Sequence, residues 1–387
     1  GPDDDRTVLL ACYDGENIFA DKSGRHIIAA YGDRLSSPTP TATDSPIGIT
    51  TNNPGLIRSV DVTNGPVLKG NFSSNSQNWL TLPKGTTTQR SRGRGIFMGG
   101  YTTSPSNSAV GDIHYINIPS MGNSFDFGDL INAARWAGGS CGSSTKGLYG
   151  GGAVPSSTDH IDYVTIATTG DAVDFGNLDT AQGYVKACSN QTRGIWGGGR
   201  SNSSPVVSSN VIQYVTIATL GNSQDFGILT SARTGIAAFS SPTRGIFSGG
   251  YTHPSPTALA TIDYVTIATT ASAVDFGDLY LAVKYSDAAS SGTRGVIGGG
   301  NPVTSQIQYV TISSRGTALD FGSLTSSLEH VSCTDNSIRG VFGGGAYVNT
   351  MQYITIATTG NAQDFGDLSR GNLGYAGGTS DSHGGIS

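Results

Sequence analysis

The segment Arg244-Gly245-Ile246-Phe247, followed by Ile262-Asp263-Tyr264-Val265-Thr266 and by Asp275-Phe276-Gly277-Asp278-Leu279, is one copy of a pattern that fills most of the chain. The first phrase recurs with its cation at Arg94, Lys146, Arg193, Arg244, Arg294 and Arg339. The second phrase recurs with its tyrosine at Tyr115, Tyr163, Tyr214, Tyr264, Tyr309 and Tyr353, and the third with its phenylalanine at Phe127, Phe175, Phe226, Phe276, Phe321 and Phe365. The tyrosine and the phenylalanine are 12 residues apart in every copy. Such regular self-similarity indicates a repeat architecture.

Each unit is expected to be a small antiparallel sheet. In the second unit, Tyr163-Val164-Thr165-Ile166 is β-branched and aromatic, a Thr-Thr-Gly turn follows, and an apolar segment resumes before Phe175. This order predicts a hairpin. Consecutive units are 44 to 52 residues apart, a spacing that suits a four-stranded blade of a β-propeller better than a solenoid or a helical array.

The two ends of the repeat region indicate how the ring closes. Gly384 follows Phe365 by 19 residues, the usual distance to the next Arg-Gly glycine, so the last segment has one strand more than its unit needs. The first unit lacks a preceding strand, because residues 84–91 are hydrophilic. A C-terminal strand supplied to the first unit would leave no exposed edge. We therefore predict an all-β, six-bladed β-propeller over residues 92–387, with a seventh blade from residues 45–93 as the alternative.

Residues 1–91 follow a different pattern and carry no Asp-Phe-Gly phrase. The segments 8–13 and 26–31 predict strands, and the Pro/Thr/Ser-rich stretch 36–46 predicts an exposed loop. We expect a small β-rich module that docks the propeller or is lectin-like. A module of this size buries little core by itself.

Composition limits the functional class. The chain has 56 glycines in 387 residues, and charged residues are only 13% of it, which disfavours a helical or α/β enzyme. The net charge is −6 and the cations are scattered singly, so nucleic acid is not an expected partner. The sequence contains no run of about 18 apolar residues, so membrane insertion is not expected. The acidic start Gly1-Pro2-Asp3-Asp4-Asp5 is unlike a secretory signal and is interpreted as a processed end or a protease scar.

The repeated charges allow two interpretations. The six motif cations either line one mouth of the ring and bind an anion, or they pair blade by blade with the motif aspartates; the pairing is favoured because it neutralises the charges. These aspartates are Asp126, Asp174, Asp225, Asp275, Asp320 and Asp364. The phenylalanine between Asp and Gly is expected in the blade core, and the glycine in a turn or bulge.

No catalytic constellation stands out. Asp-Phe-Gly invites a kinase interpretation, but a catalytic-loop His-Arg-Asp is absent from the sequence. Cys141 and Cys188 occupy the slot filled by Phe239 and Ala289 in later units, which indicates apolar packing rather than a disulfide or a metal site. The six histidines share neither metal-ligand spacing nor a repeat position. We therefore expect no enzyme activity, cofactor or metal.

One connection varies in length between units, whereas the others are nearly constant. It covers residues 101–112, 153–160, 200–211, 251–261, 301–306 and 346–350. Insertions confined to one connection of a repeat map to one face, which is often the binding face. The three longest loops contain side chains suited to stacking on sugars or filling a partner's pockets. The candidate contacts are Tyr101, Arg200, Tyr251 and His253.

The three phrases, as they stand in residues 244–279, resemble the kelch-like repeats of virion proteins of tailed bacteriophages, especially marine ones, over about residues 92–384. The tryptophan expected on the outer strand of a kelch unit is replaced in this chain by the phenylalanine of Asp-Phe-Gly. The segment 8–32 looks like the opening strands of a laminin-G or concanavalin-like module, although it is much shorter.

The resemblance implies a propeller on a tail fibre, a tail appendage or the capsid surface. The expected localisation is then the virion surface or extracellular space, and the expected partners are other virion proteins and a host-surface glycan or protein. Self-association into a homo-oligomer is left open. The alternatives are a purely structural particle protein without a ligand and a propeller enzyme acting on carbohydrate.

Overall fold

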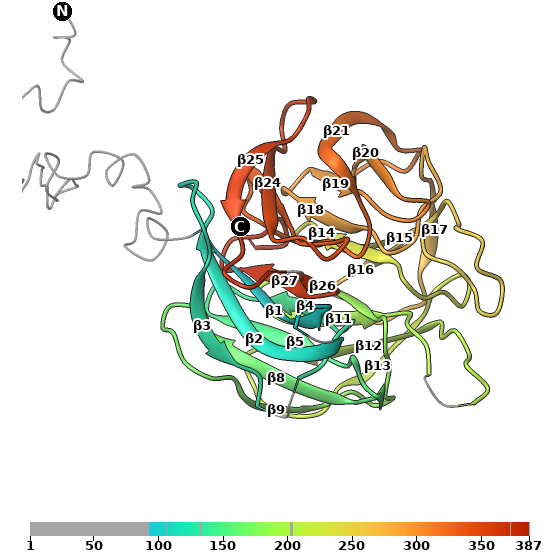
Figure 1. Cartoon of the computed structure of the whole chain (residues 1–387). Helices are drawn as coiled ribbons and strands as arrows, with labels where there is room; N and C mark the ends of the chain where they lie inside the picture. The colour runs from blue at the N-terminus through green and yellow to red at the C-terminus, as the bar shows by residue number, and fades with distance from the viewer. Residues whose placement is uncertain (1–92, 106, 132–133, 202–203, 372, 387) are drawn as a thin grey trace, which may run out of the picture. The chain divides into compact units, whose positions relative to one another are not determined.

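Six antiparallel β-sheets stand in a ring in the computed structural model (Figure 1). The structure describes residues 93–386 except 106, 132, 133, 202, 203 and 372, and within this part every regular element is a β-strand. The predicted six-bladed β-propeller is confirmed, and the seven-bladed alternative is wrong. The predicted module at residues 1–91 lies outside the described residues.

The strands of each blade follow one another from the channel outward. Blade 1 contains β27 (Gly377–Ser380), β1 (Arg94–Thr102), β2 (Ser108–Asn117) and β3 (Phe125–Asp129), with β26 (Leu373–Gly374) also paired to β1. Blade 2 contains β4 (Gly139–Gly142), β5 (Lys146–Gly150), β8 (His160–Thr165) and β9 (Val173–Asn177), with a hairpin of β6 (Ala153–Val154) and β7 (Ser156–Ser157) between β5 and β8. Blade 3 contains β10 (Lys186–Ser189), β11 (Arg193–Gly197), β12 (Val211–Thr216) and β13 (Gln224–Ile228).

The other three blades repeat this plan. Blade 4 contains β14 (Ala237–Ser240), β15 (Arg244–Ser248), β16 (Thr261–Thr266) and β17 (Val274–Asp278). Blade 5 contains β18 (Asp287–Ser290), β19 (Arg294–Gly298), β20 (Thr304–Thr311) and β21 (Leu319–Leu328). Blade 6 contains β22 (Ser332–Asp335), β23 (Arg339–Gly343), β24 (Thr350–Thr355) and β25 (Gln363–Asp367).

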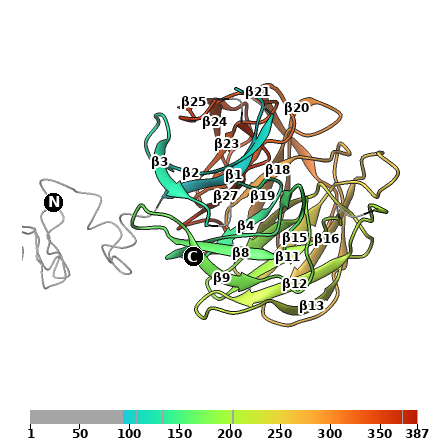
Figure 2. The ribbon, with the colours of Figure 1, turned by 60° about the horizontal axis from the view of Figure 1, so that its bottom comes forward.

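A C-terminal strand closes the ring, as predicted. Strand β27 pairs antiparallel with β1, from Met98 opposite Gly377 to Gly95 opposite Ser380, and Figure 2 shows the two strands side by side. Gly384, from which closure was predicted, is not in this strand. The second-strand place of blade 1 is already filled by β1, so the chain leaves the sheet after Ser380.

The Asp-Phe-Gly phrase forms a β-bulge in each blade. In blade 3, Ile212 pairs with Gly227 and Gln213 pairs with Asp225, which leaves Phe226 as the extra residue. All six motif phenylalanines are buried. Each packs into one of six apolar clusters that join adjacent blades: Phe226, for example, shares a cluster with Phe247 of blade 4. The phrase therefore supplies both the bend of the outer strand and the core between blades.

The glycine of the Arg-Gly phrase makes room for an inner-strand side chain of the preceding blade. A Cβ on Gly194 would lie 2.7 Å from Cys141 Sγ, and one on Gly295 would lie 1.9 Å from Phe239 Cε2. Cys141 and Cys188 are both buried and free. The apolar packing slot predicted for these cysteines is confirmed, and it explains why the second strand carries glycine at this point.

The favoured pairing of motif cations with motif aspartates is wrong. Arg244 Nη1 donates to the carbonyl of Ile312 in blade 5 at 2.7 Å, and its guanidinium lies 4.6 Å from the ring centre of Tyr264. The other five cations likewise lie over the tyrosine of their own blade and donate to a carbonyl of the next blade, and they do not line the channel. The aspartates are exposed, and no ion pair between described residues joins them to these cations.

Strand register explains this outcome. Arg244 on β15 lies opposite Thr266 of β16. Asp275 lies on β17, the strand on the other side of β16, and is opposite Asp263, three residues before Thr266. The cation reaches sideways to the neighbouring blade instead. A tyrosine face and a main-chain carbonyl both attract a cation, and together they tie consecutive blades.

Candidate functional site: the loop-bearing mouth

All six variable connections open on one mouth of the ring. They join the second strand of each blade to the third and cover residues 103–107, 151–159, 198–210, 249–260, 299–303 and 344–349. The inner strands run antiparallel to the second strands, so the first residue of each inner strand lies at the same end of the channel as these loops. We call this end of the channel the loop-bearing mouth, and the end where the inner strands finish the opposite mouth.

Six equivalent residues in left-handed backbone conformation form a rim at the loop-bearing mouth. They precede the inner strands, have φ between 56° and 65°, and are Ala137, Tyr184, Gly235, Tyr285, His330 and Tyr375. A non-glycine residue pays about 1 to 2 kcal/mol for this conformation. Main-chain hydrogen bonds of 2.7 to 3.4 Å link five of the six consecutive pairs around the rim. These bonds offset the strain and fix the direction of each side chain.

Four of the rim side chains are aromatic and converge over the channel. The His330 and Tyr375 rings are stacked with centroids 3.9 Å apart, and Tyr375 Oη lies 2.7 Å from His330 Nε2. Tyr184 contacts Tyr375 at 5.8 Å and Tyr285 at 5.9 Å. The space that these rings help to line is only about 30 Å³. The aromatic rings therefore close this end of the channel.

Further side chains surround the rim. They come from the residues at which the variable loops begin, and these residues pair with the segments just before the inner strands. Tyr101 lies opposite Gly374 in a short ladder, and single bridges join Arg200 to Gly183 and Tyr251 to Thr234. Three of the four predicted contacts are thus brought to one place. The fourth, His253, lies further along its loop, where its N–H donates to Ser208 Oγ at 2.8 Å; no ring contact joins it to this cluster within the described residues.

Trp136 connects the rim to the blade 1 loop. Its ring centroid is 5.3 Å from that of Tyr101, 5.1 Å from Tyr184 and 4.9 Å from Tyr375. Trp136 is partly exposed, and its indole N–H has no acceptor within the part of the chain described. Trp136 is therefore an accessible aromatic donor held in place by three rings.

Two cations lie against Tyr251, which is 5% exposed. Arg200 donates from Nη1 to Tyr251 Oη at 3.0 Å and stands 4.1 Å from the ring centre of Tyr184. Lys284 Nζ is 4.8 Å from the Tyr251 ring centre and donates to the Pro256 carbonyl at 2.7 Å. Burial raises the pKa of Tyr184 to about 12, against the opposing charge of Arg200, so this phenol stays a neutral donor at physiological pH.

Sequence reasoning missed most of this cluster, namely Trp136, Tyr184, Lys284, Tyr285, His330, Tyr347 and Tyr375. A signal for part of it was present. The rim residue follows the motif phenylalanine by nine or ten positions in every unit, and it is tyrosine in three units and histidine in a fourth. An aromatic residue repeated at a constant offset, directly before a strand, marks a shared structural position.

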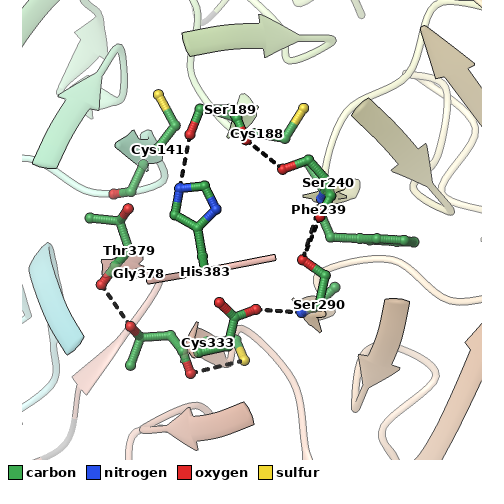
Figure 3. A pocket seen from close by; sticks show the side chains of 16 residues that line it. Cys141, Cys188, Ser189, Phe239, Ser240, Ser290, Cys333, Gly378, Thr379 and His383 are labelled. Atoms are coloured by element: carbon green, nitrogen blue, oxygen red, sulfur yellow. Dashed lines mark hydrogen bonds between the residues drawn. The ribbon is translucent and has the colours of Figure 1, made fainter. Parts of the chain in front are cut away.

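The channel between the two mouths is narrow and polar. Residues of all six inner strands surround the His383 ring in Figure 3, and the space left between them is about 40 Å³, room for one or two waters. Serine hydroxyls donate to the inner-strand carbonyl of the preceding blade: Ser189 to Gly142 at 2.7 Å, Ser240 to Ser189 at 2.8 Å and Ser290 to Ser240 at 2.9 Å. This belt holds the inner ends of the blades together.

The segment after β27 closes the opposite mouth. The Asp381 carboxylate accepts hydrogen bonds from the backbone N–H groups of Gly93 at 2.6 Å and Arg94 at 3.2 Å. His383 Nε2 lies 2.9 Å from the Gly142 carbonyl, which also accepts from Ser189 Oγ at 2.7 Å. A Cβ on Gly385 would lie 1.7 Å from the Ser189 carbonyl, so only glycine fits there. Both ends of the channel are therefore filled by the chain's own residues.

An ion pair also joins the inner strands of two blades that are not adjacent. Lys186 Nζ of blade 3 lies 2.9 Å from Asp287 Oδ2 of blade 5, and the same oxygen accepts from the Cys333 N–H at 3.0 Å. Burial raises the pKa of Asp287, opposed by Lys186. These charged groups are satisfied by one another and tie blades 3, 5 and 6 together, which is a structural role.

The described residues contain neither a group of three or more His, Cys, Asp or Glu side chains placed to hold a metal ion nor a helix that could span a membrane. The loop-bearing mouth brings together aromatic rings, N–H and O–H donors, and two cations. Neither a scan of protein-family models nor a search of curated proteins found a match to the chain.

Proposed function

We propose that this chain is a non-enzymatic binding protein of a bacteriophage particle, whose propeller presents the loop-bearing mouth to a ligand on the host surface. One observation carries the proposal: the six variable loops and the aromatic and cationic cluster share the same mouth. Trp, Tyr and Arg dominate the binding energy of most recognition surfaces. A rigid ring that holds such side chains among length-variable loops is well suited to recognition.

The small free volume of the channel favours a binding function over a catalytic one. Its free space of about 40 Å³ is far below the roughly 300 to 1,000 Å³ of ordinary small-molecule pockets. The channel therefore has no room for a substrate. A propeller enzyme acting on carbohydrate is therefore the weaker alternative.

The virion setting rests on the resemblance of the repeats to kelch-like phage proteins. In this proposal the chain lies on the virion surface, other virion proteins are its partners, and residues 1–91 dock it to the particle. The rival is a decorative particle protein without a ligand, for which the mouth cluster would serve stability alone.

Competition for host adsorption tests the proposal. The purified chain should block adsorption of the particle that carries it. The loops at 198–210 and 249–260 would be shortened to the length of the loop at 344–349, and Trp136→Ala would be made separately. Both changes should abolish the block, whereas Lys146→Gln, at the other end of the blades, should leave it intact. Failure of the parent chain to compete would favour the decorative role, and full competition by both variants would refute the binding mouth.

A further inference from the structure

We propose that the ligand of the loop-bearing mouth is an acidic saccharide, whose sugar rings contact Trp136 and Tyr101 and whose anionic group lies on the side of the mouth that holds Arg200 and Lys284. This inference rests on the proposed function and names the chemistry of its ligand. It follows from four features of the mouth: its shape, its aromatic rings, its hydrogen-bond donors and the position of its charges.

The shape requires a ligand that lies on the mouth rather than inside it. The space at the rim is about 30 Å³ and is lined by Tyr184, Tyr285, His330 and Tyr375 among others. A deeply inserted apolar molecule or a peptide side chain would have to displace rings that pack against one another. An extended ligand that contacts ring faces and edges fits without this cost.

The accessible aromatics suit a sugar because each combines an apolar face with a polar tip. Trp136 is partly exposed, and its N–H has no acceptor within the described part of the chain. Tyr101, also partly exposed, contacts Trp136 at 5.3 Å and Tyr347 at 6.4 Å with ring planes inclined by 59° and 61°, so the three rings form an angled aromatic surface. The C–H face of a pyranose can lie on such a surface while its hydroxyls accept from the donors at the edge.

Several hydrogen-bond donors lie at the polar edge of this surface. Tyr251 Oη accepts hydrogen bonds from Arg200 Nη1 at 3.0 Å and from Tyr285 Oη at 2.9 Å, so its own hydroxyl proton is turned away from both. Lys284 and the Trp136 N–H add further donors. A ligand rich in acceptor oxygens matches this edge, and a carboxylate or sulfate offers the strongest acceptors.

The charges give the ligand a direction. Arg200 and Lys284 both contact Tyr251, which stands between them, and Lys284 forms no ion pair within the described residues. The carboxylate of Glu329 belongs to blade 6, accepts from Asn301 Nδ2 at 2.8 Å and lies 3.7 Å from His330 Nε2. An anionic group is therefore attracted to the side of blades 3 to 5 and repelled from the side of blade 6.

The test uses three probes that separate the anionic group from the sugar: an oligogalacturonate, its methyl ester and a sulfated oligosaccharide. Binding to the full chain would be measured by calorimetry at low salt and at about 1 M salt, where the Debye length is about 3 Å. We expect the acid and the sulfate to bind at least about tenfold more tightly than the ester, a difference of about 1.4 kcal/mol. The preference should fall at high salt.

Two variants and one matched control locate the site. Lys284→Gln should remove most of the preference for the acid while the ester still binds, and Trp136→Ala should weaken all three probes. Lys146→Gln removes the same charge at the other end of the blades and should leave the binding of all three probes unchanged. Circular dichroism and the melting temperature of each variant establish that it is folded.

The possible failures are distinguishable. Equal binding of acid and ester, unaffected by Lys284→Gln but lost in Trp136→Ala, would overturn the acidic ligand and leave the proposed function standing. Binding of no probe, together with undiminished competition for host adsorption, would overturn the saccharide and indicate a protein ligand. Undiminished binding of the probes by Trp136→Ala would overturn this placement of the site.

Discussion

Arg233 Nη2 lies 2.6 Å from Asp263 Oδ2 in blade 4, and both side chains are fully buried. Blade 2 has the same pair, Arg135 and Asp162, at 3.1 Å. The other four blades hold neutral groups at the two positions: Gln182 with Gln213, Val283 with Gln308, Leu328 with Gln352, and Leu373 with His114. The buried acid occurs only where its arginine is present, because an unpaired buried carboxylate is costly.

The Arg233–Asp263 ion pair can be removed, and the lost stability partly recovered, by substituting residues that other blades have at the same two positions. Arg233→Leu should destabilise the protein by about 3 to 5 kcal/mol, because Asp263 keeps its burial and loses its partner. The double change Arg233→Leu and Asp263→Gln copies blade 6 and should recover more than half of that loss. Urea unfolding followed by tryptophan fluorescence measures both. A double variant no more stable than the single one would show that the ion pair is not a separable unit.

The sequence predicted the ring because its strongest signals are local. Phe226 and Gly227 sit in a bulge that their own strand forms, and the Tyr-to-Phe spacing records one hairpin. The pairing of Arg244 with Asp275 failed because sequence spacing does not show which neighbour a side chain meets, and that neighbour belongs to the next blade. The position of His383 in the channel depends on several blades at once and has no local signal.

The motif charges should differ sharply in their contribution to stability. Arg244→Met removes a hydrogen bond to the Ile312 carbonyl and a cation over Tyr264, and should cost about 1 to 3 kcal/mol. Asp275→Asn changes an exposed side chain without an ion pair and should cost less than about 0.5 kcal/mol. Thermal unfolding of the two variants compares them directly. Equal losses of stability in the two variants would indicate that Arg244 and Asp275 do form an ion pair.

The contact between Gly295 and Phe239 should behave as a coupled pair. Gly295→Ala places a Cβ 1.9 Å from Phe239 Cε2 and should cost about 1 to 3 kcal/mol or more through overpacking. Combining it with Phe239→Ala should cost less than the sum of the two single changes, since the smaller side chain frees the space. Gly292→Ala is the control, because nothing lies within 4 Å of its added Cβ. If the losses of stability from the two single changes simply add in the double variant, Gly295 and Phe239 do not share a packing slot.

Removal of the closing strand should open the ring. Deleting residues 377–387 leaves the inner edge of β1 unpaired, from Gly95 to Met98, and each unsatisfied backbone group costs about 1 to 3 kcal/mol. We expect a much lower melting temperature and aggregation on size-exclusion chromatography. Deleting only residues 382–387 keeps β27 and should lower the melting temperature less. If the longer deletion stays monodisperse with an unchanged melting temperature, closure by β27 does not stabilise the ring.

His383 makes the seal of the opposite mouth sensitive to acid. Its Nδ1 accepts a hydrogen bond from the Gly385 N–H at 3.1 Å, so the proton of the neutral ring is on Nε2, which donates to the Gly142 carbonyl at 2.9 Å. Burial lowers the pKa of His383 from 6.5 to about 4. A second proton on the ring would have to sit on Nδ1, where it would face the N–H of Gly385 instead of accepting from it.

The direction of the pH dependence follows from this lowered pKa. Between pH 6.5 and about 4 the unfolded chain binds more protons at this position than the folded chain, so the stability contributed by His383 is complete above pH 6.5 and is lost as the pH falls towards 4. His383→Gln should therefore lower the melting temperature at pH 7.5, and the gap between variant and parent should narrow at pH 4.5. Asp287 and Asp335, whose pKa values burial raises, act in the opposite direction but equally in both proteins, so they cancel in the comparison. A gap that stays constant from pH 7.5 to 4.5 would show that His383 does not titrate with folding.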